Sequence, residues 1–124
     1  MGLCTRYDAT VKPDTECRKF LENHIWIPVC PEQLGGMPTP RPAADIVNGD
    51  GLDVLQGKAQ VCTIEGDDVS ASFIKGAQEV LNIARSQTIK GVCLKARSPS
   101  CAVSGITGVA AALLKQNGFK LYEF

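Results

Sequence analysis

The sequence has no excess of charge of either sign and no long apolar run, and both absences exclude classes of protein. Its 124 residues include 13 Lys and Arg and 13 Asp and Glu, so the formal net charge is zero. A neutral chain offers no extended surface for a nucleic-acid backbone, although a local basic patch could still exist. No stretch approaches the roughly 18 consecutive apolar residues of a membrane-spanning helix, so we expect no membrane segment.

Export and common ligand-binding motifs are absent as well. The chain runs from Met1 straight into the charged Arg6 and Asp8, without the apolar core of a signal peptide, so we expect a cytoplasmic protein. No C-x-x-C pair occurs among the six cysteines, which argues against zinc ribbons and thioredoxin-type sites. The glycines at 105 and 108 lack the strand and the complete G-x-G-x-x-G pattern of a dinucleotide site.

The sequence does contain alternating helical and strand-like segments. The clearest is a helix over 68–86, whose apolar residues recur every three or four positions behind the candidate caps Asp67 and Asp68. Further helices are predicted over 14–23 and 104–117, and the predicted strands are 25–29, 58–64, 90–95 and 119–122. The Gly- and Pro-rich stretch between Pro31 and Asp53 is predicted to be a long functional loop.

These segments predict an α/β fold. The β-α-β-α-β order of the carboxyl half favours right-handed crossovers, and hence a small, mostly parallel β-sheet with helices packed on it. We expect a Rossmann-like three-layer arrangement. With 44% hydrophobic residues the chain can form a core, and residues 1–124 are expected to make one domain.

The six cysteines divide into two groups by their surroundings. Cys17, Cys62 and Cys93 lie on an apolar helix face or inside strand-like runs, where a free cysteine is commonly a small buried hydrophobe. We expect Cys17 and Cys93 to be buried and to form no disulfide. Cys4 and the remaining two, Cys30 and Cys101, lie in loops or at strand ends.

Cys30 and Cys101 are the most informative residues. Each sits in a proline-flanked turn after an apolar, strand-like run, and parallel strands end at a shared edge, so the two thiols are predicted to converge. Converging thiolates suit a soft metal or an iron–sulfur cluster; the alternative is a pair of unligated surface thiols. The amino end of the 104–117 helix is expected to lower the pKa of a thiol at Cys101 and could bind an anion.

Glu32 and Arg41 flank the Gly- and Pro-rich segment. The carboxylate could act as a proton donor or an extra metal ligand, and the guanidinium could hold a polar substrate. The alternative is a salt bridge within the loop, which the spacing alone favours.

Several blocks of the chain resemble one known family. They are Thr5-Arg6-Tyr7-Asp8, Pro28-Val29-Cys30-Pro31-Glu32-Gln33-Leu34-Gly35-Gly36, Pro38-Thr39-Pro40-Arg41, Phe73 with Gly76-Ala77, Leu94-Lys95-Ala96-Arg97-Ser98-Pro99-Ser100-Cys101, and Ala111-Ala112-Leu113-Leu114. The family is that of the TudS-like thiouracil desulfidases, long catalogued as a domain of unknown function. The resemblance covers nearly the whole chain, and its Pro-Val-Cys-Pro-Glu and Ser-Pro-Ser-Cys blocks are specific.

The resemblance implies an activity and a cofactor. A 4Fe–4S cluster, held by three cysteines with one iron open, would take sulfur from a thiolated uracil or nucleoside. Cys30 and Cys101 match two of the ligands. Glu32 and either Ser98 or Ser100 match catalytic positions beside the cluster, and the substrate-binding positions correspond to Tyr7 and Arg41. The expected partner is a small thiolated base or nucleoside; no oligomeric state is implied.

The chain departs from the family pattern at two places. Members usually carry a strand and a Cys-Leu-Leu-Gly block before the Arg-Tyr-Asp block, whereas here only Met1-Gly2-Leu3-Cys4 precedes it. Either Cys4 supplies the third ligand or that ligand is absent. A glycine-rich stretch with Tyr-Asp-Gly is also missing after Cys101.

These departures leave three possibilities. One is a cluster-dependent desulfidase with Cys4 as the third ligand. Another is a shortened, cluster-free relative that acts as a binding module or lacks activity. The third is a mononuclear metal or redox thiol protein using Cys4, Cys30 and Cys101.

Overall fold

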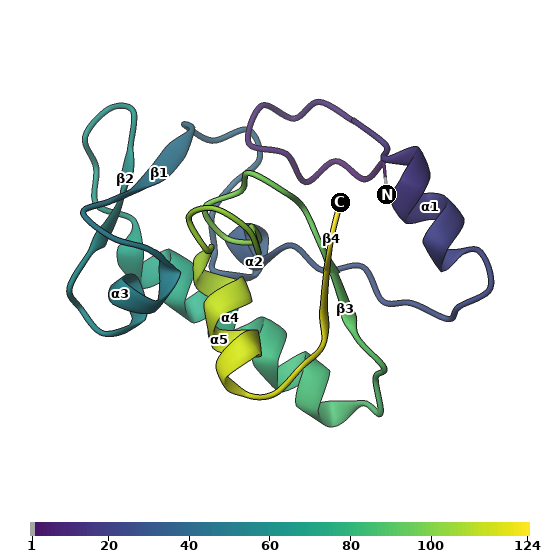
Figure 1. Cartoon of the computed structure of the whole chain (residues 1–124). Helices are drawn as coiled ribbons and strands as arrows, with labels where there is room; N and C mark the ends of the chain where they lie inside the picture. Colours follow the sequence, from purple (N-terminus) through teal and green to yellow (C-terminus); the bar gives the residue numbers. More distant parts are fainter. Residues whose placement is uncertain (1) are drawn as a thin grey trace.

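The computed structural model describes residues 2–124 and combines helices with two small sheets (Figure 1). The mixed content agrees with an α/β class. Along the chain the elements are α1 (Thr15–Leu21), α2 (Pro31–Leu34), β1 (Ala44–Val47), α3 (Gly51–Leu55), β2 (Gln60–Thr63), α4 (Ser70–Ser86), β3 (Val92–Leu94), α5 (Val109–Gln116) and β4 (Leu121–Glu123).

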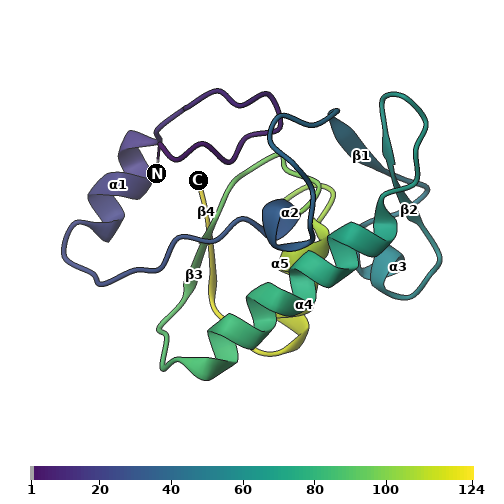
Figure 2. The same ribbon diagram turned by 180° about the vertical axis from the view of Figure 1, so that it is seen from behind.

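Helix α4 is the central helix of the core and confirms the helix predicted over 68–86. Its apolar stripe packs along α5, and the two helices share both clusters of buried side chains (Figure 2). Phe73 and Ala77, with Val109 of α5, belong to the cluster beside α3 and β2. The other cluster, on the side of β3, contains Leu81 of α4 and Leu114 of α5. The stripe therefore faces the core along the whole helix, as its spacing predicts.

The ends of the helices agree in part with the sequence signals. Asp14 caps α1, and its side chain accepts a hydrogen bond from the Cys17 amide. Gly118, with φ of 81°, follows the end of α5 in the left-handed conformation that glycine favours. Val69 occupies the cap position of α4 and makes no side-chain cap bond, while the Asp68 carboxylate accepts from the Ser70 amide and hydroxyl.

The two sheets do not form the expected Rossmann-like parallel layer. Strands β3 and β4 pair in parallel, with Cys93 opposite Tyr122. Strands β1 and β2 pair in antiparallel fashion, with Asp45 opposite Cys62. Because each of these sheets contains two strands, the helices pack mainly on one another. The predicted segments 58–64, 90–95 and 119–122 do contain strands.

The strand predicted over 25–29 is wrong. This segment is extended but belongs to neither sheet, and its side chains face outward: Ile25 is fully exposed and Trp26 is 43% exposed. A strand needs a neighbour for its amide and carbonyl groups, and Pro28 has no amide hydrogen to donate. Apolar and β-branched composition alone therefore did not identify a sheet strand.

The segment between Pro31 and Asp53 is not one long loop. It contains α2, β1 and the beginning of α3, each too short to show a period in the sequence. Pro31 occupies the first turn of α2, where a missing amide hydrogen costs nothing. The Asp50 carboxylate caps α3, and Asp53 completes a reciprocal capping box.

The helix predicted over 104–117 begins later, at Val109. Gly105 has φ of 69°, which interrupts any helix at that point, and Gly108 is the cap residue. Across residues 2–124, none of the helices combines the length and apolarity required to cross a bilayer.

Candidate active site

The first half of the candidate site is carried by α2. Cys30 is the residue that caps this helix, and Glu32 lies in its first turn. Helix α2 is pressed against α4 (Figure 2). A side chain at Gly76 would overlap the Pro31 carbonyl, and one at Gly35 would overlap the Ser72 carbonyl. The two glycines therefore allow the backbone contact that places Cys30 and Glu32 against the amino-terminal half of α4.

The second half is the Ser98–Cys101 turn, which begins just after β3. The Ser98 hydroxyl oxygen accepts hydrogen bonds from the amides of Ser100 and Cys101, each at 3.2 Å. The turn rests directly on Gly108, since a side chain there would overlap the Ser100 carbonyl carbon and the Cys101 amide. Ser98 and Gly108 together hold the turn from both sides.

Carbonyl groups of this turn accept hydrogen bonds from the first amides of α5. The Val109 amide donates to the Pro99 carbonyl, and the Ala110 and Ala111 amides donate to the Ser100 carbonyl. These three amides are therefore not available to a thiolate or an anion. The predicted lowering of the Cys101 pKa is wrong for this reason.

Burial governs the Cys101 thiol instead. Loss of solvent raises the pKa of Cys101 to about 12, and the nearby Ser98 hydroxyl opposes this shift only in part. Smaller contributions from Glu32 and Cys30 raise the pKa further, which shows that both groups lie close to Cys101. Cys30 therefore acts on Cys101 across the site, although it arrives there from a helix cap and not from a strand.

Glu32 joins the two halves. Its Oε1 accepts a hydrogen bond from the Ser100 hydroxyl at 3.1 Å, and its Oε2 accepts from Arg41 Nε at 2.6 Å. The Ser100 residue is 2% exposed. The Arg41 and Glu32 side chains are 3% and 15% exposed. The salt bridge that spacing favours therefore exists, but it lies inside the site and links it to the cysteine-bearing turns.

Arg41 makes further bonds that fix its position. Its Nη1 donates to the Pro38 carbonyl and the Thr39 hydroxyl, and its Nη2 donates to the Thr5 carbonyl at 2.8 Å. The Arg41 amide donates to the Tyr7 carbonyl at 2.7 Å. Arg41 therefore holds both the Glu32 carboxylate and the N-terminal segment.

The same N-terminal segment brings Cys4 near Cys30. The Cys30 thiol donates to the Thr5 carbonyl at 3.8 Å, and Gln33 Nε2 donates to the Cys4 carbonyl at 3.1 Å. The Cys4 side chain is exposed and turned outward, with its thiol donating to the Ala9 carbonyl at 3.5 Å. Its backbone is thus anchored near Cys30, while its thiol is engaged with the Ala9 carbonyl.

The donor set fits an iron–sulfur cluster at two of three positions. Cys30 and Cys101 supply two soft thiols, and Cys4 would have to turn its side chain to supply a third. In the part of the chain that the structure describes, no group of three or more His, Cys, Asp or Glu side chains is arranged to hold a metal ion.

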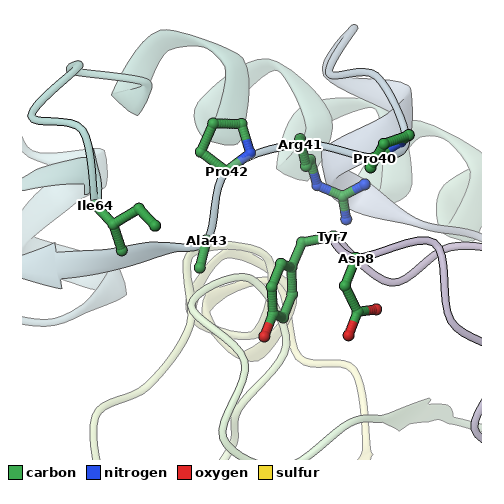
Figure 3. Close-up of a pocket in the computed structure, with 7 residues that line it drawn as sticks. All are labelled: Tyr7, Asp8, Pro40, Arg41, Pro42, Ala43 and Ile64. Carbon is green, nitrogen blue, oxygen red and sulfur yellow. The ribbon is translucent and has the colours of Figure 1, made fainter.

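Tyr7 and Arg41 line one open pocket of about 540 Å³ (Figure 3). The Tyr7 ring is 43% exposed there, whereas the Arg41 guanidinium is turned into the protein toward Glu32. Asp8 is directed to its own neighbours: the Arg6 guanidinium, foremost, and Thr10 hold the pKa of this carboxyl well below its usual range. The remaining lining residues are Pro40, Pro42, Ala43 and Ile64.

Some functional contacts could not be found from the sequence. Nothing in the pattern separated Ser98 from Ser100; the structure shows that Ser98 supports the turn and Ser100 meets Glu32. Thr5 and Gln33 were not identified as residues that anchor the N-terminal segment. Their only signal was their place inside the quoted motif blocks.

Comparison with known proteins gives three findings. A family model described as 2-thiouracil desulfurase matches residues 1–123. The Uncharacterized protein YbbK of Bacillus subtilis (strain 168) is 36% identical over 132 aligned positions, covering 97% of this chain and 87% of that protein. A solved structure of a 4Fe–4S-dependent thiouracil desulfidase, TudS, superposes with a TM-score of 0.78 at 30% identity, covering 98% of this chain and 83% of the other.

Proposed function

Because the chain belongs to the 2-thiouracil desulfurase family, we propose that it replaces the sulfur of a thiolated uracil or nucleoside with oxygen, using a 4Fe–4S cluster. The observation that carries the proposal is the Glu32 carboxylate. It contacts the hydroxyl of Ser100 on one side and the guanidinium of Arg41 on the other, beside the thiols of Cys30 and Cys101. A carboxylate placed between a hydroxyl and soft metal ligands suits a reaction in which water replaces sulfur.

Cys30, Cys101 and Cys4 would hold the cluster. When bound, the cluster would supply a soft Lewis acid with affinity for a thiocarbonyl sulfur. Cys30 and Cys101 would supply two of the thiolates, since the Cys30 thiol already raises the pKa of Cys101. Cys4 must rotate away from the Ala9 carbonyl, while Gln33 keeps its backbone in place.

The protein's own residues supply the proton transfers. Overall, the thiocarbonyl and one water give a carbonyl and hydrogen sulfide. Glu32 Oε1, which now accepts from Ser100, would accept a proton from the attacking water and return it to the departing sulfur. Arg41 occupies Oε2 and so fixes the orientation of the carboxylate, which leaves Oε1 for the proton transfer. Ser98 positions the turn that carries Ser100 and Cys101.

The pocket lined by Tyr7 is the proposed place for the pyrimidine ring. Its exposed phenol ring gives a flat apolar surface on which a base can stack. Arg41 both lines this pocket and donates to Glu32, so its role toward the substrate would be to place the ring next to that carboxylate.

The test is sulfide release by protein reconstituted anaerobically with iron and sulfide. Wild type should show a broad absorbance near ~400 nm and release sulfide from 2-thiouracil or 4-thiouracil. Glu32→Gln should keep the absorbance and the iron content but lower the rate by about 10²–10⁴-fold, as expected for loss of an acid–base group. The matched control is Glu79→Gln, which alters an exposed carboxylate on α4 and should leave the rate unchanged.

Two results would contradict the proposal. If Glu32→Gln releases sulfide at the wild-type rate, the carboxylate is not the acid–base group. If wild type takes up no iron under conditions that reconstitute a related desulfidase, the chain is a cluster-free member of the family, which corresponds to the alternative of a binding module or an inactive relative.

A further inference from the structure

Two cysteines outside the candidate site face each other. Cys17 lies on α1, and Cys93 lies in the middle of β3. Each thiol contributes to the shift in the pKa of the other, so the two lie close together, and both are free. Cys17 is 8% exposed and Cys93 is half-buried, so the expectation of burial is confirmed for Cys17 and only partly for Cys93.

The packing of α1 on the β3–β4 pair independently explains why Cys17 and Cys93 lie close together. Cys93 is the register partner of Tyr122 in the parallel β3–β4 pair, so the two side chains leave the sheet on the same face. Phe20 of α1 packs on that face, with its ring centroid 4.9 Å from Tyr122 and 5.6 Å from Phe124. Cys17 lies three residues before Phe20 and hence on the same side of the helix. The helix therefore presents Cys17 to Cys93 as part of an ordered interface.

We propose that Cys17 and Cys93 are a reversible disulfide site, which is oxidised by a low-molecular-weight disulfide. This proposal concerns residues outside the desulfidase site and does not depend on the proposed function. Two neighbouring thiols, each on an element of the same packed interface, need no large rearrangement to be joined. Burial raises the pKa of both thiols, so thiol–disulfide exchange is slow. The pair therefore stays reduced during a brief exposure to the oxidant and is oxidised during a long one.

The reaction is two successive exchanges. The Cys93 thiolate, from the less buried residue, attacks one sulfur of the small disulfide, forms a mixed disulfide and releases one small thiolate. The Cys17 thiolate then attacks the Cys93 sulfur, forming the protein disulfide and releasing the second small thiolate. The two protein thiols lose two protons and two electrons in total, and the small disulfide gains them.

The crosslink would restrain the chain segments that lead into the candidate site. From α1 the chain leads back to Thr5, whose carbonyl accepts from Arg41 and Cys30. From β3 it leads directly to the turn that holds Cys101. A crosslink over such a long loop should raise the ratio of folded to unfolded protein by roughly 30- to 1,000-fold.

Tryptic mapping of the wild-type chain tests the proposal. Trypsin places each cysteine on a separate peptide; Cys17 falls on 7–18, because Lys12 precedes a proline, and Cys93 falls on 91–95. After incubation with excess oxidised glutathione and blocking of free thiols, we expect a linked 7–18/91–95 peptide that dithiothreitol separates. The oxidised protein should also unfold at a higher urea concentration than the reduced protein.

Variants and a control complete the test. Cys17→Ser and Cys93→Ser should each abolish the linked peptide and the shift in urea midpoint. Cys62→Ser, which changes a half-buried cysteine on β2, should keep both. Free thiols or stable mixed disulfides on both peptides, under conditions that modify the exposed Cys4, would overturn the proposal. Because mapping uses wild type and does not measure sulfide release, its failure is distinguishable from failure of the proposed activity.

Discussion

Loss of the Arg41 side chain should destabilise this protein more than loss of any exposed ion pair. The Arg41–Glu32 pair is 2.6 Å apart with side chains 3% and 15% exposed, and Arg41 also donates to Pro38, Thr39 and Thr5. Arg41→Met leaves a largely buried carboxylate without its cation. Removing one partner of such a pair costs about 3–5 kcal/mol of the free energy of unfolding.

A control variant should separate the loss of the buried ion pair from the general effect of replacing an arginine by methionine. The matched control is Arg6→Met, because Arg6 pairs with Asp8 at 3.2 Å with side chains 25% and 34% exposed. Its effect on the unfolding midpoint should be far smaller. Since Trp26 is already 43% exposed in the folded protein, urea unfolding is best followed by far-UV circular dichroism.

A double-mutant cycle isolates the interaction itself. Glu32→Gln removes the charge that Arg41 neutralises, so the double variant should lose less than the sum of the single losses, with a coupling energy of at least about 1.5 kcal/mol. If Arg41→Met fails to fold, Arg41→Lys replaces it in the cycle. A loss below about 1 kcal/mol for Arg41→Met, as at a surface pair, would refute the reasoning that Arg41 and Glu32 form a buried structural link.

Three further predictions follow from the site. Cys4→Ser should prevent stable cluster assembly and sulfide release without changing the circular dichroism spectrum; retention of the cluster would show that Cys4 is not a ligand. Gly76→Ala should cost roughly 1–3 kcal/mol through its overlap with the Pro31 carbonyl, and an unchanged urea midpoint would show that α2 and α4 are not in backbone contact. Because the pKa of Cys101 is raised to about 12, cluster-free protein should alkylate there slowly at pH 8 and much faster once unfolded in urea. Equal alkylation rates of folded and unfolded protein would contradict the raised pKa. The same raised pKa means that the contribution of this thiol to the free energy of unfolding is complete below pH ~9. This contribution is lost as the pH rises toward ~12, because the thiol of the unfolded chain releases its proton first.

Helix α4 and its contact face could be predicted from the sequence, because an apolar side chain every three or four residues is a local property. The same is true of the Asp14 cap and of the Gly118 stop, since both act within one turn of the chain. The family was also recognisable, because its motif blocks are contiguous runs such as the one around Cys30.

The tertiary structure decided the pairing of strands and the geometry of the site. Whether residues 25–29 form a strand depends on a hydrogen-bonding neighbour from elsewhere in the chain, which composition does not encode. The distinction between Ser98 and Ser100, and the choice of Glu32 as the bridge, depend on contacts between residues up to 68 positions apart. The raised pKa of Cys101 follows in the same way, because burial and the closure of the α5 amides by the Pro99 and Ser100 carbonyls exist only once these distant segments have packed together.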